Sequence, residues 1–288
     1  MRVSESRALP VRAVRWLNFQ RRLKIRQARR WIAFEDIARF EADRAPRAGG
    51  RFGEVFLAHE GQVAHKWDHY LPVYEQLLGR YAEGFVDENG GRRPLRFLEI
   101  GVSEGGSLEV WRKYFGPEAV IHGLDIDPKC AFVVPDSVAR VHIGSQDDGE
   151  LLRRVVREMG GVDVVLDDGS HVASHQRATF DVLWPLLAEG GVYICEDLHT
   201  AYWPGYEGGL HRPGQFISVA KALVDGMHRW YARMPDTQLH RSGQHEVRAV
   251  HFYDSVVAIE KVRRKPPTWT KSGTGTKEDR AKEAGHVG

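Results

Sequence analysis

Cysteine is scarce in this chain of 288 residues, and long apolar runs are absent. Cys130 and Cys195 are too few for a disulfide framework, so a reducing, cytoplasmic compartment is expected. No stretch approaches the roughly 18 consecutive apolar residues of a membrane-spanning helix. The basic N-terminus is not followed by an apolar segment or a small-residue cleavage site, so we expect no signal peptide. The length predicts one large domain with additions, or two small ones.

The net charge of +2 hides an uneven distribution. Residues 1–48 carry 13 Lys and Arg against 5 Asp and Glu, and residues 261–288 carry 8 against 3. The intervening residues 49–260 are acidic, with 20 basic against 31 acidic side chains. An acidic body argues against nucleic-acid binding and favours the binding of cations.

The basic N-terminal arm, residues 1–48, has a helical pattern of apolar residues with arginines between them. Such a helix can pack on its own domain or on a second subunit, and this is the preferred interpretation. Peripheral contact with an anionic membrane is the alternative. Residues 45–53, with a proline and paired glycines, are expected to be a linker, and residues 265–288 a flexible tail.

From residue 95 the chain alternates between apolar strand-like runs and amphipathic helical segments. This order predicts an α/β fold with a doubly wound, mostly parallel sheet, closed by a C-terminal antiparallel hairpin. The expected strands are 95–100, 120–124, 138–143, 162–166, 192–195, 246–252 and 255–262, and the expected helices are 107–115, 148–159, 174–187 and 216–233.

A glycine-rich turn joins the first of these strands to its helix. Gly101, Gly105 and Gly106 follow the strand, and a helical stretch begins at Ser107. This order is typical of the site where an α/β sheet binds a nucleotide-like cofactor. Ser103 stands where the second glycine of the dinucleotide motif would be, so that motif is not matched.

Acidic residues end several of the expected strands. Asp125 is placed to accept hydrogen bonds from ribose hydroxyls, with Asp127 as its rival. Asp168, Glu196 and Asp197 end two neighbouring strands, where like charges repel unless a cation neutralises them. Oxygen ligands suit Mg²⁺ or a similar ion. His171 is placed to take a proton, with His199 as a substitute.

Aromatic and histidine residues cluster in two further segments. Residues 65–70 either cover the cofactor or acceptor, or form part of a capping helix. The loop at residues 199–214 contains Tyr202, Trp203 and Tyr206, which either line a binding site or pack on a neighbouring subunit.

These motifs resemble class I S-adenosylmethionine-dependent methyltransferases with a Rossmann-like fold. Gly-Leu-Asp-Ile-Asp-Pro, Asp-Asp-Gly-Ser-His and Glu-Asp-Leu-His-Thr-x-Tyr-Trp resemble the metal-dependent sugar O-methyltransferases of macrolide pathways in particular. The similarity covers about residues 55–262, within an expected catalytic domain at 49–264. It implies His171 as the general base and Asp168, Glu196 and Asp197 as metal ligands. The expected cofactor contacts are Glu99, Gly101, Ser103, Gly105, Ser107, Asp125, Asp127, Ser145, Gln146 and Asp167, and the expected acceptor contacts are His199, Tyr202 and Trp203.

The resemblance implies an O-methyltransferase that uses S-adenosylmethionine and Mg²⁺ or a similar divalent cation. Its acceptor would be a hydroxyl of a saccharide or glycoside, and a homo-oligomer is expected. Two alternatives stay open at this stage: a non-heme iron hydroxylase, and a non-catalytic subunit that binds the cofactor.

Overall fold

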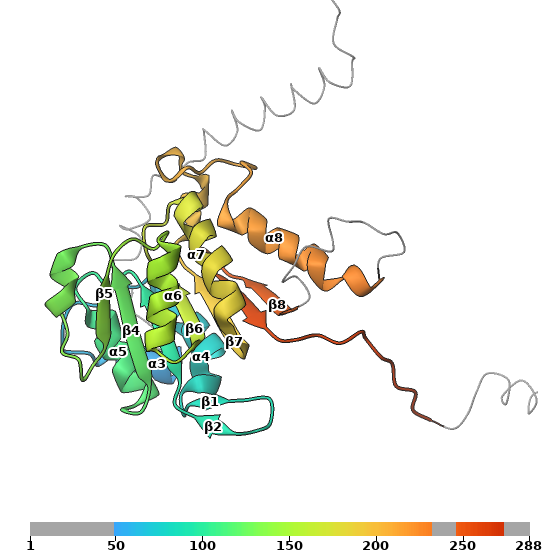
Figure 1. The fold of residues 1–288 in the computed structure, drawn as a ribbon, viewed down its shortest axis with the longest axis horizontal. Helices are drawn as coiled ribbons and strands as arrows, with labels where there is room; N and C mark the ends of the chain where they lie inside the picture. The colour runs from blue at the N-terminus through green and yellow to red at the C-terminus, as the bar shows by residue number, and fades with distance from the viewer. Residues whose placement is uncertain (1–48, 232–245, 274–288) are drawn as a thin grey trace, which may run out of the picture. The chain divides into compact units, whose positions relative to one another are not determined.

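A seven-stranded sheet forms the centre of the fold (Figure 1). The computed structural model describes residues 49–231 and 246–273. The strand order is β5-β4-β3-β6-β7-β9-β8, with parallel pairing from β5 to β7 and antiparallel pairing of β9 with β7 and β8. The strands are β3 (Arg96–Ile100), β4 (Val120–Asp125), β5 (Arg140–Ile143), β6 (Val162–Asp167), β7 (Leu187–Cys195), β8 (Val247–Phe252) and β9 (Val257–Lys261). The expected doubly wound sheet with its C-terminal hairpin is confirmed.

Helices cover both faces of this sheet, which is why its inner strands are apolar on both sides. Neighbouring residues of β3 show the alternation: Phe97 packs in the core beneath α3, α4 and α5, and Leu98 packs in the core beneath α6, α7 and α8. The helices are α3 (Arg51–Leu57), α4 (Leu71–Leu78), α5 (Gly106–Phe115), α6 (Gly149–Glu158), α7 (Ala173–Leu186) and α8 (Phe216–Met227). Short 3-10 turns, η1 (Asp68–Tyr70), η3 (Pro128–Phe132), η4 (Leu198–Tyr202) and η5 (Pro204–Tyr206), precede or link these elements.

The strand order reverses beside β3, which pairs with β4 on one side and with β6 on the other. From β3 the chain runs outward to β5 and then returns to β6. The connections at the carboxyl ends of β3 and β6 therefore diverge and leave a crevice, the usual ligand position in open α/β sheets. This crevice contains the candidate site.

The prediction of a linker was wrong at its carboxyl end. Residues 45–53 were expected to be a linker, but α3 begins at Arg51. The reason is the burial of Phe52, which is 1% exposed, stacks on Trp111 at 4.5 Å and packs edge-on against Tyr74 at 5.0 Å. An aromatic anchor of this kind overrides the local glycine signal.

The ends of the chain are described only in part. The expected arm, residues 1–48, and residues 274–288 of the expected tail lie outside the described residues, while residues 265–273 have no regular secondary structure. The helix expected at 216–233 ends at Met227, with residues 232–233 again outside the description. Among the helices that are described, none has the length and hydrophobicity needed to cross a membrane.

The buried carboxylate of Asp163 stabilises the amino end of β6 by binding two arginines. Asp163 is fully buried and accepts hydrogen bonds of 2.6 Å from both terminal nitrogens of Arg93 and of 2.7 Å from Arg96. These arginines lower the pKa of Asp163 against the opposing effect of burial. The Asp163→Ala substitution should lower the free energy of unfolding by about 3–5 kcal/mol, because two guanidinium groups lose their partner. Urea titration measures the change.

Asp181→Ala is the matched control for this prediction. Asp181 forms an exposed pair with Arg177 at 2.7 Å on the surface of α7. Exposed pairs of this spacing contribute roughly 0.3–0.5 kcal/mol. Equal losses of stability in Asp163→Ala and Asp181→Ala would contradict the assignment of a buried anchor.

Two histidines on neighbouring strands should make the free energy of unfolding depend on pH. His122 Nδ1 of β4 lies 2.9 Å from His142 Nε2 of β5. Burial, the neighbouring His142 and Arg140 lower the pKa of His122 to about 4, while Glu158 opposes this shift. Burial likewise lowers the pKa of His142, opposed by Glu158 and reinforced by Arg140 and Arg154.

A histidine pKa that is lower in the folded state favours proton uptake by the unfolded chain. The stability contributed by the neutral pair is therefore present above about pH 6.5 and is lost as the pH falls toward 4. Urea titrations between pH 7.5 and 4.5 should show a shallower pH dependence for His122→Gln than for the unsubstituted protein. Identical slopes would contradict this account.

Candidate active site

The glycine turn after β3 is shaped by residues with positive φ. Gly101 has φ 90°, Ser103 has φ 49° and Gly105 has φ 85°, directly before α5. A Cβ atom at Gly101 would collide with the carbonyl oxygen of Asp168, so glycine is required where the ends of β3 and β6 approach each other. The glycine turn, where the cofactor is expected, therefore lies directly against Asp168, one of the expected metal ligands.

Asp125, at the end of β4, organises the outer part of this turn. Its Oδ2 atom accepts hydrogen bonds from the backbone N–H groups of Val102 at 2.8 Å and Ser103 at 3.0 Å. Its Oδ1 atom accepts one from Asp127 N–H at 2.9 Å. Although burial opposes it, these hydrogen bonds lower the pKa of Asp125. Asp125 is therefore a fixed carboxylate at the crevice.

Two adjoining cavities lie along the carboxyl ends of the strands. A cavity of about 170 Å³ and one of about 370 Å³ share Gly101, Asp125 and Gly169 in their linings. Their combined volume falls in the range of small-molecule sites. The expected cofactor contacts that line them are Gly101, Ser103, Ser107, Asp125, Ser145 and Gln146.

The other expected cofactor contacts do not line these two cavities. Glu99 is fully buried and accepts hydrogen bonds from Ser107 Oγ at 2.8 Å and Trp111 Nε1 at 3.2 Å, and burial raises its pKa to about 7. Gly105 is the N-cap of α5, and Asp127 caps η3 by accepting a hydrogen bond from Lys129 N–H. Direct cofactor contact by these residues stays a prediction.

Asp167 also lies beneath the cavities rather than in their walls. It accepts hydrogen bonds from Tyr193 OH at 2.7 Å and Gln146 Nε2 at 3.0 Å, and burial raises its pKa to about 6. Gln146 in turn accepts one from Ser170 N–H at 2.6 Å. Asp167 therefore orients Gln146, which lines the smaller cavity.

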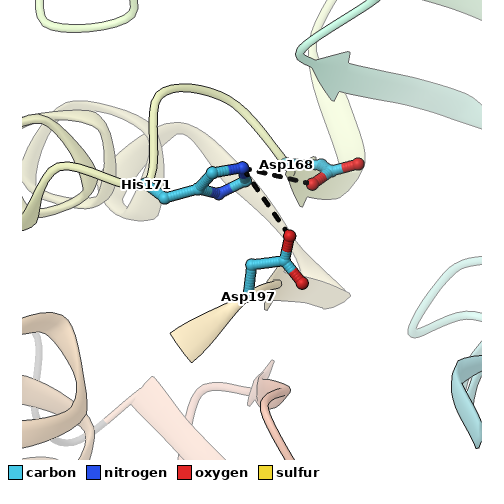
Figure 2. A group of neighbouring side chains, drawn as sticks. All are labelled: Asp168, His171 and Asp197. Atoms are coloured by element: carbon cyan, nitrogen blue, oxygen red, sulfur yellow. Dashed lines mark ion pairs between the residues drawn. The ribbon is translucent and has the colours of Figure 1, made fainter. Parts of the chain in front are cut away.

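One histidine and two carboxylates converge, as Figure 2 shows, and all three line the larger cavity. His171 Nε2 lies 3.9 Å from Asp168 Oδ1 and 3.7 Å from Asp197 Oδ2, and one ligand atom from each residue lies within 4.8 Å of the others. His171 and Asp197 have positive φ values of 58° and 53°. Backbone strain of this kind is characteristic of functional sites.

Glu196 lies apart from this group. Tyr74 OH donates to its Oε1 atom at 2.5 Å, and Lys66 Nζ donates to its Oε2 atom at 2.9 Å. Burial raises the pKa of Glu196, and the Lys66 ammonium opposes that shift. Of the three expected metal ligands, the structure gathers Asp168 and Asp197 around His171, and ligation by Glu196 stays a prediction.

The segment before α4 and α4 itself supply contacts that the sequence did not predict. Lys66 contacts Asp168 and Glu196, Tyr74 contacts Glu196, and Tyr70 OH donates to Asp197 Oδ1 at 2.7 Å. The three donors are spaced four residues apart, a helical spacing that could have indicated a shared face. His65 and Lys66 also line the larger cavity, which favours the interpretation that residues 65–70 cover the site.

Aromatic side chains form a row next to the histidine. His171 and Tyr206 have ring centroids 6.4 Å apart, Tyr206 and Trp203 6.0 Å, Trp203 and His199 4.9 Å, and His199 and Trp67 6.3 Å. Tyr202, the remaining expected acceptor contact, is 45% exposed. Acceptor binding by His199, Tyr202 and Trp203 stays a prediction.

The group of Asp168, His171 and Asp197 fits a hard divalent cation. Carboxylate oxygens are preferred by Mg²⁺, and the Lys66 ammonium already lies between two of the acids as a cation would. His171 Nδ1 is buried and has no hydrogen-bond partner among the described residues. One histidine with two carboxylates is the reverse of the two-histidine, one-carboxylate triad of non-heme iron oxygenases, which disfavours the hydroxylase alternative.

Comparison with known proteins agrees with this geometry. Residues 98–198 match a family described as a methyltransferase domain. The chain is 35% identical over 226 residues to the 8-demethyl-8-(2-methoxy-alpha-L-rhamnosyl)-tetracenomycin-C 3'-O-methyltransferase of Streptomyces olivaceus, covering 74% of this chain and 54% of that protein. It is 37% identical over 191 residues to the mycinamicin VI 2''-O-methyltransferase of Micromonospora griseorubida, covering 61% of this chain and 46% of that protein.

A solved structure is similar over most of the chain. It is that of MycE methyltransferase from the mycinamycin biosynthetic pathway, in complex with Mg, SAH and mycinamycin VI. The TM-score is 0.61 at 29% identity, covering 83% of this chain and 59% of that one. This chain spans about half the length of the curated relatives that it matches. Residues 98–198 therefore form a methyltransferase domain, and the chain is similar to the sugar O-methyltransferases of macrolide and tetracenomycin pathways.

Proposed function

We propose that this protein transfers a methyl group from S-adenosylmethionine to a hydroxyl of a saccharide or glycoside, with Mg²⁺ or a similar divalent cation. The observation that carries the proposal is the convergence of Asp168, His171 and Asp197 at a cavity that also contains the glycine turn. The relatives that methylate sugars of glycosylated natural products support it.

The cofactor is expected along the two adjoining cavities, where S-adenosylmethionine supplies the methyl group when bound. The turn at Gly101 allows close approach to the backbone, and the fixed carboxylate of Asp125 accepts hydrogen bonds from hydroxyl groups. Ser145 and Gln146 line the far end of the smaller cavity.

The acceptor hydroxyl is expected between the cavity and His171. Asp168 and Asp197 would hold the divalent cation, with Glu196 as the third expected ligand, and the cation when bound would lower the pKa of an acceptor hydroxyl. His171 Nε2 would take the hydroxyl proton as the oxygen attacks the methyl carbon, and the methyl–sulfur bond breaks to release S-adenosylhomocysteine. The aromatic row from His171 to Trp67 offers flat apolar surfaces that exclude water and pack against a sugar ring.

The larger organisation is part of the same proposal. Residues 49–264 are the catalytic domain, and residues 1–48 and 265–288 are an arm and a tail. We expect the protein to act in the cytoplasm as a homo-oligomer, without nucleic-acid binding. Size-exclusion chromatography with light scattering on the full chain and on a chain lacking residues 1–48 tests the arm, since loss of assembly is expected.

A transfer assay tests the proposed activity. The full chain is incubated with S-adenosylmethionine, MgCl₂ and a panel of deoxysugar, mannoside and glucoside acceptors, and the products are analysed by mass spectrometry. We expect a mass gain of one methyl group on a hydroxylated acceptor, loss of the product with EDTA, and its return with excess Mg²⁺. Undiminished transfer in EDTA would exclude the cation from the mechanism.

A further inference from the structure

We propose that Lys66 is an internal counter-ion that competes with the divalent cation for the acidic side chains of the site. The inference rests on the proposed function, because it concerns the same cation. It assigns to Lys66 a role in setting how tightly the protein binds that cation.

Lys66 is placed as a cation within the acidic cluster. Its Nζ atom lies 2.5 Å from Asp168 Oδ2 and 2.9 Å from Glu196 Oε2, and 4.0 Å from Glu99 Oε1. The Lys66 side chain is only 5% exposed, and those of Glu99 and Glu196 are 1% exposed. Contacts this short to two carboxylates are those of a charge-assisted pair, so the Lys66 side chain acts as an ammonium.

Asp168 and Asp197 each direct one carboxylate oxygen toward His171 and the other toward a different partner. Asp168 presents Oδ2 to Lys66 and Oδ1 to His171. Asp197 presents Oδ1 to Tyr70 and Oδ2 to His171. Asp168 is therefore shared between the ammonium and any cation bound beside His171, whereas the partner of Asp197 is an uncharged hydroxyl.

Sharing of this kind has two opposite effects. In the absence of a divalent cation, the ammonium reduces the repulsion among Asp168, Glu196 and Glu99 and stabilises the fold. When the cation binds beside His171, the ammonium repels it across the shared carboxylate of Asp168. Lys66 thus stabilises the cation-free protein and weakens cation binding.

The Lys66→Met substitution in the full chain separates these effects, because it keeps the length of the side chain and removes its charge. Isothermal titration with MgCl₂ alone should show at least about tenfold tighter binding for Lys66→Met, since a like charge has been removed next to the cation. Thermal unfolding in EDTA should show a lower melting temperature for this variant, and a larger rise on addition of Mg²⁺.

Two further variants control for side effects. Tyr70→Phe removes a neutral donor from Asp197 and changes no charge, so it should weaken Mg²⁺ binding, by up to roughly 10–100-fold, rather than tighten it. Lys113→Met removes an exposed lysine and should leave both the affinity and the melting temperature unchanged. Lys66→Gln, which keeps a hydrogen-bond donor, replaces Lys66→Met if that variant does not fold.

The outcomes distinguish a failure of the counter-ion role of Lys66 from a failure of the proposed methyl-transfer function. If the unsubstituted protein binds Mg²⁺ and the Lys66 variants bind it no more tightly, the counter-ion role is overturned while the proposed activity stands. If the unsubstituted protein binds no divalent cation, the cation of the proposed function fails, and the inference fails with it. Tighter binding together with a less stable cation-free protein supports the inference.

Discussion

The His171→Ala variant is expected to transfer methyl groups about 10²–10⁴-fold more slowly than the unsubstituted protein, the usual loss when a general base is removed. The expectation follows from geometry, since His171 Nε2 lies within 4 Å of carboxylate oxygens on two neighbouring strand ends. A hydroxylated acceptor that reaches the cation between Asp168 and Asp197 must also pass beside this nitrogen. Initial rates with labelled S-adenosylmethionine give the measurement.

The slower methyl transfer of His171→Ala is expected to come from the loss of the base and not from unfolding of the protein. Cofactor affinity, measured by titration with S-adenosylhomocysteine, should therefore stay within about threefold, because His171 is not at the end of the crevice formed by Asp125 and Gln146. His251→Ala is the matched control, since His251 pairs with Glu260 on the C-terminal hairpin at 2.9 Å. A fully active His171→Ala protein would show that another group takes the proton.

The Asp197→Asn variant is expected to lose Mg²⁺ binding by at least about 100-fold, because residues that only support a metal ligand already contribute 10–100-fold when replaced. Asp197 is the more informative of the two acids, since its other oxygen contacts a neutral tyrosine hydroxyl rather than the Lys66 ammonium. Isothermal titration with MgCl₂ measures the affinity, and methyl transfer should fall in parallel.

An exposed acid on α8 provides the control for this variant. Asp225→Asn removes the same charge far along the chain and should leave Mg²⁺ affinity unchanged. If Asp197→Asn binds Mg²⁺ as tightly as the unsubstituted protein, the ion is held elsewhere. In that case the group of Asp168, His171 and Asp197 has a different role.

The sheet and the acidic strand ends could be predicted from the sequence because their signals are local. Apolar runs such as Val162–Asp167 alternate with amphipathic helices, and polar residues begin where each strand stops. In a parallel sheet these ends meet at one edge, so Asp125, Asp168 and Asp197 could be placed together without coordinates. The glycine turn at Gly101 was predictable for the same reason.

The remaining parts of the site depend on contacts between distant segments, which local patterns do not encode. Lys66 meets Glu196 across 130 positions of the chain, and Tyr70 meets Asp197 across 127. Neighbouring residues at the end of β7 also separate: Glu196 is buried toward Tyr74, while Asp197, with positive φ, turns toward His171. The spacing of the acids alone therefore did not predict which of them share one group with the histidine.

Anomalous diffraction from a crystal grown with Mn²⁺ and S-adenosylhomocysteine tests the central claim most directly. Manganese replaces magnesium at oxygen-rich sites and is located without ambiguity at its absorption edge. We predict one strong peak between Asp168 and Asp197, about 2.0–2.3 Å from a carboxylate oxygen of each and beside the His171 ring. A peak at another place on the sheet edge, or no peak at that position, would contradict the account.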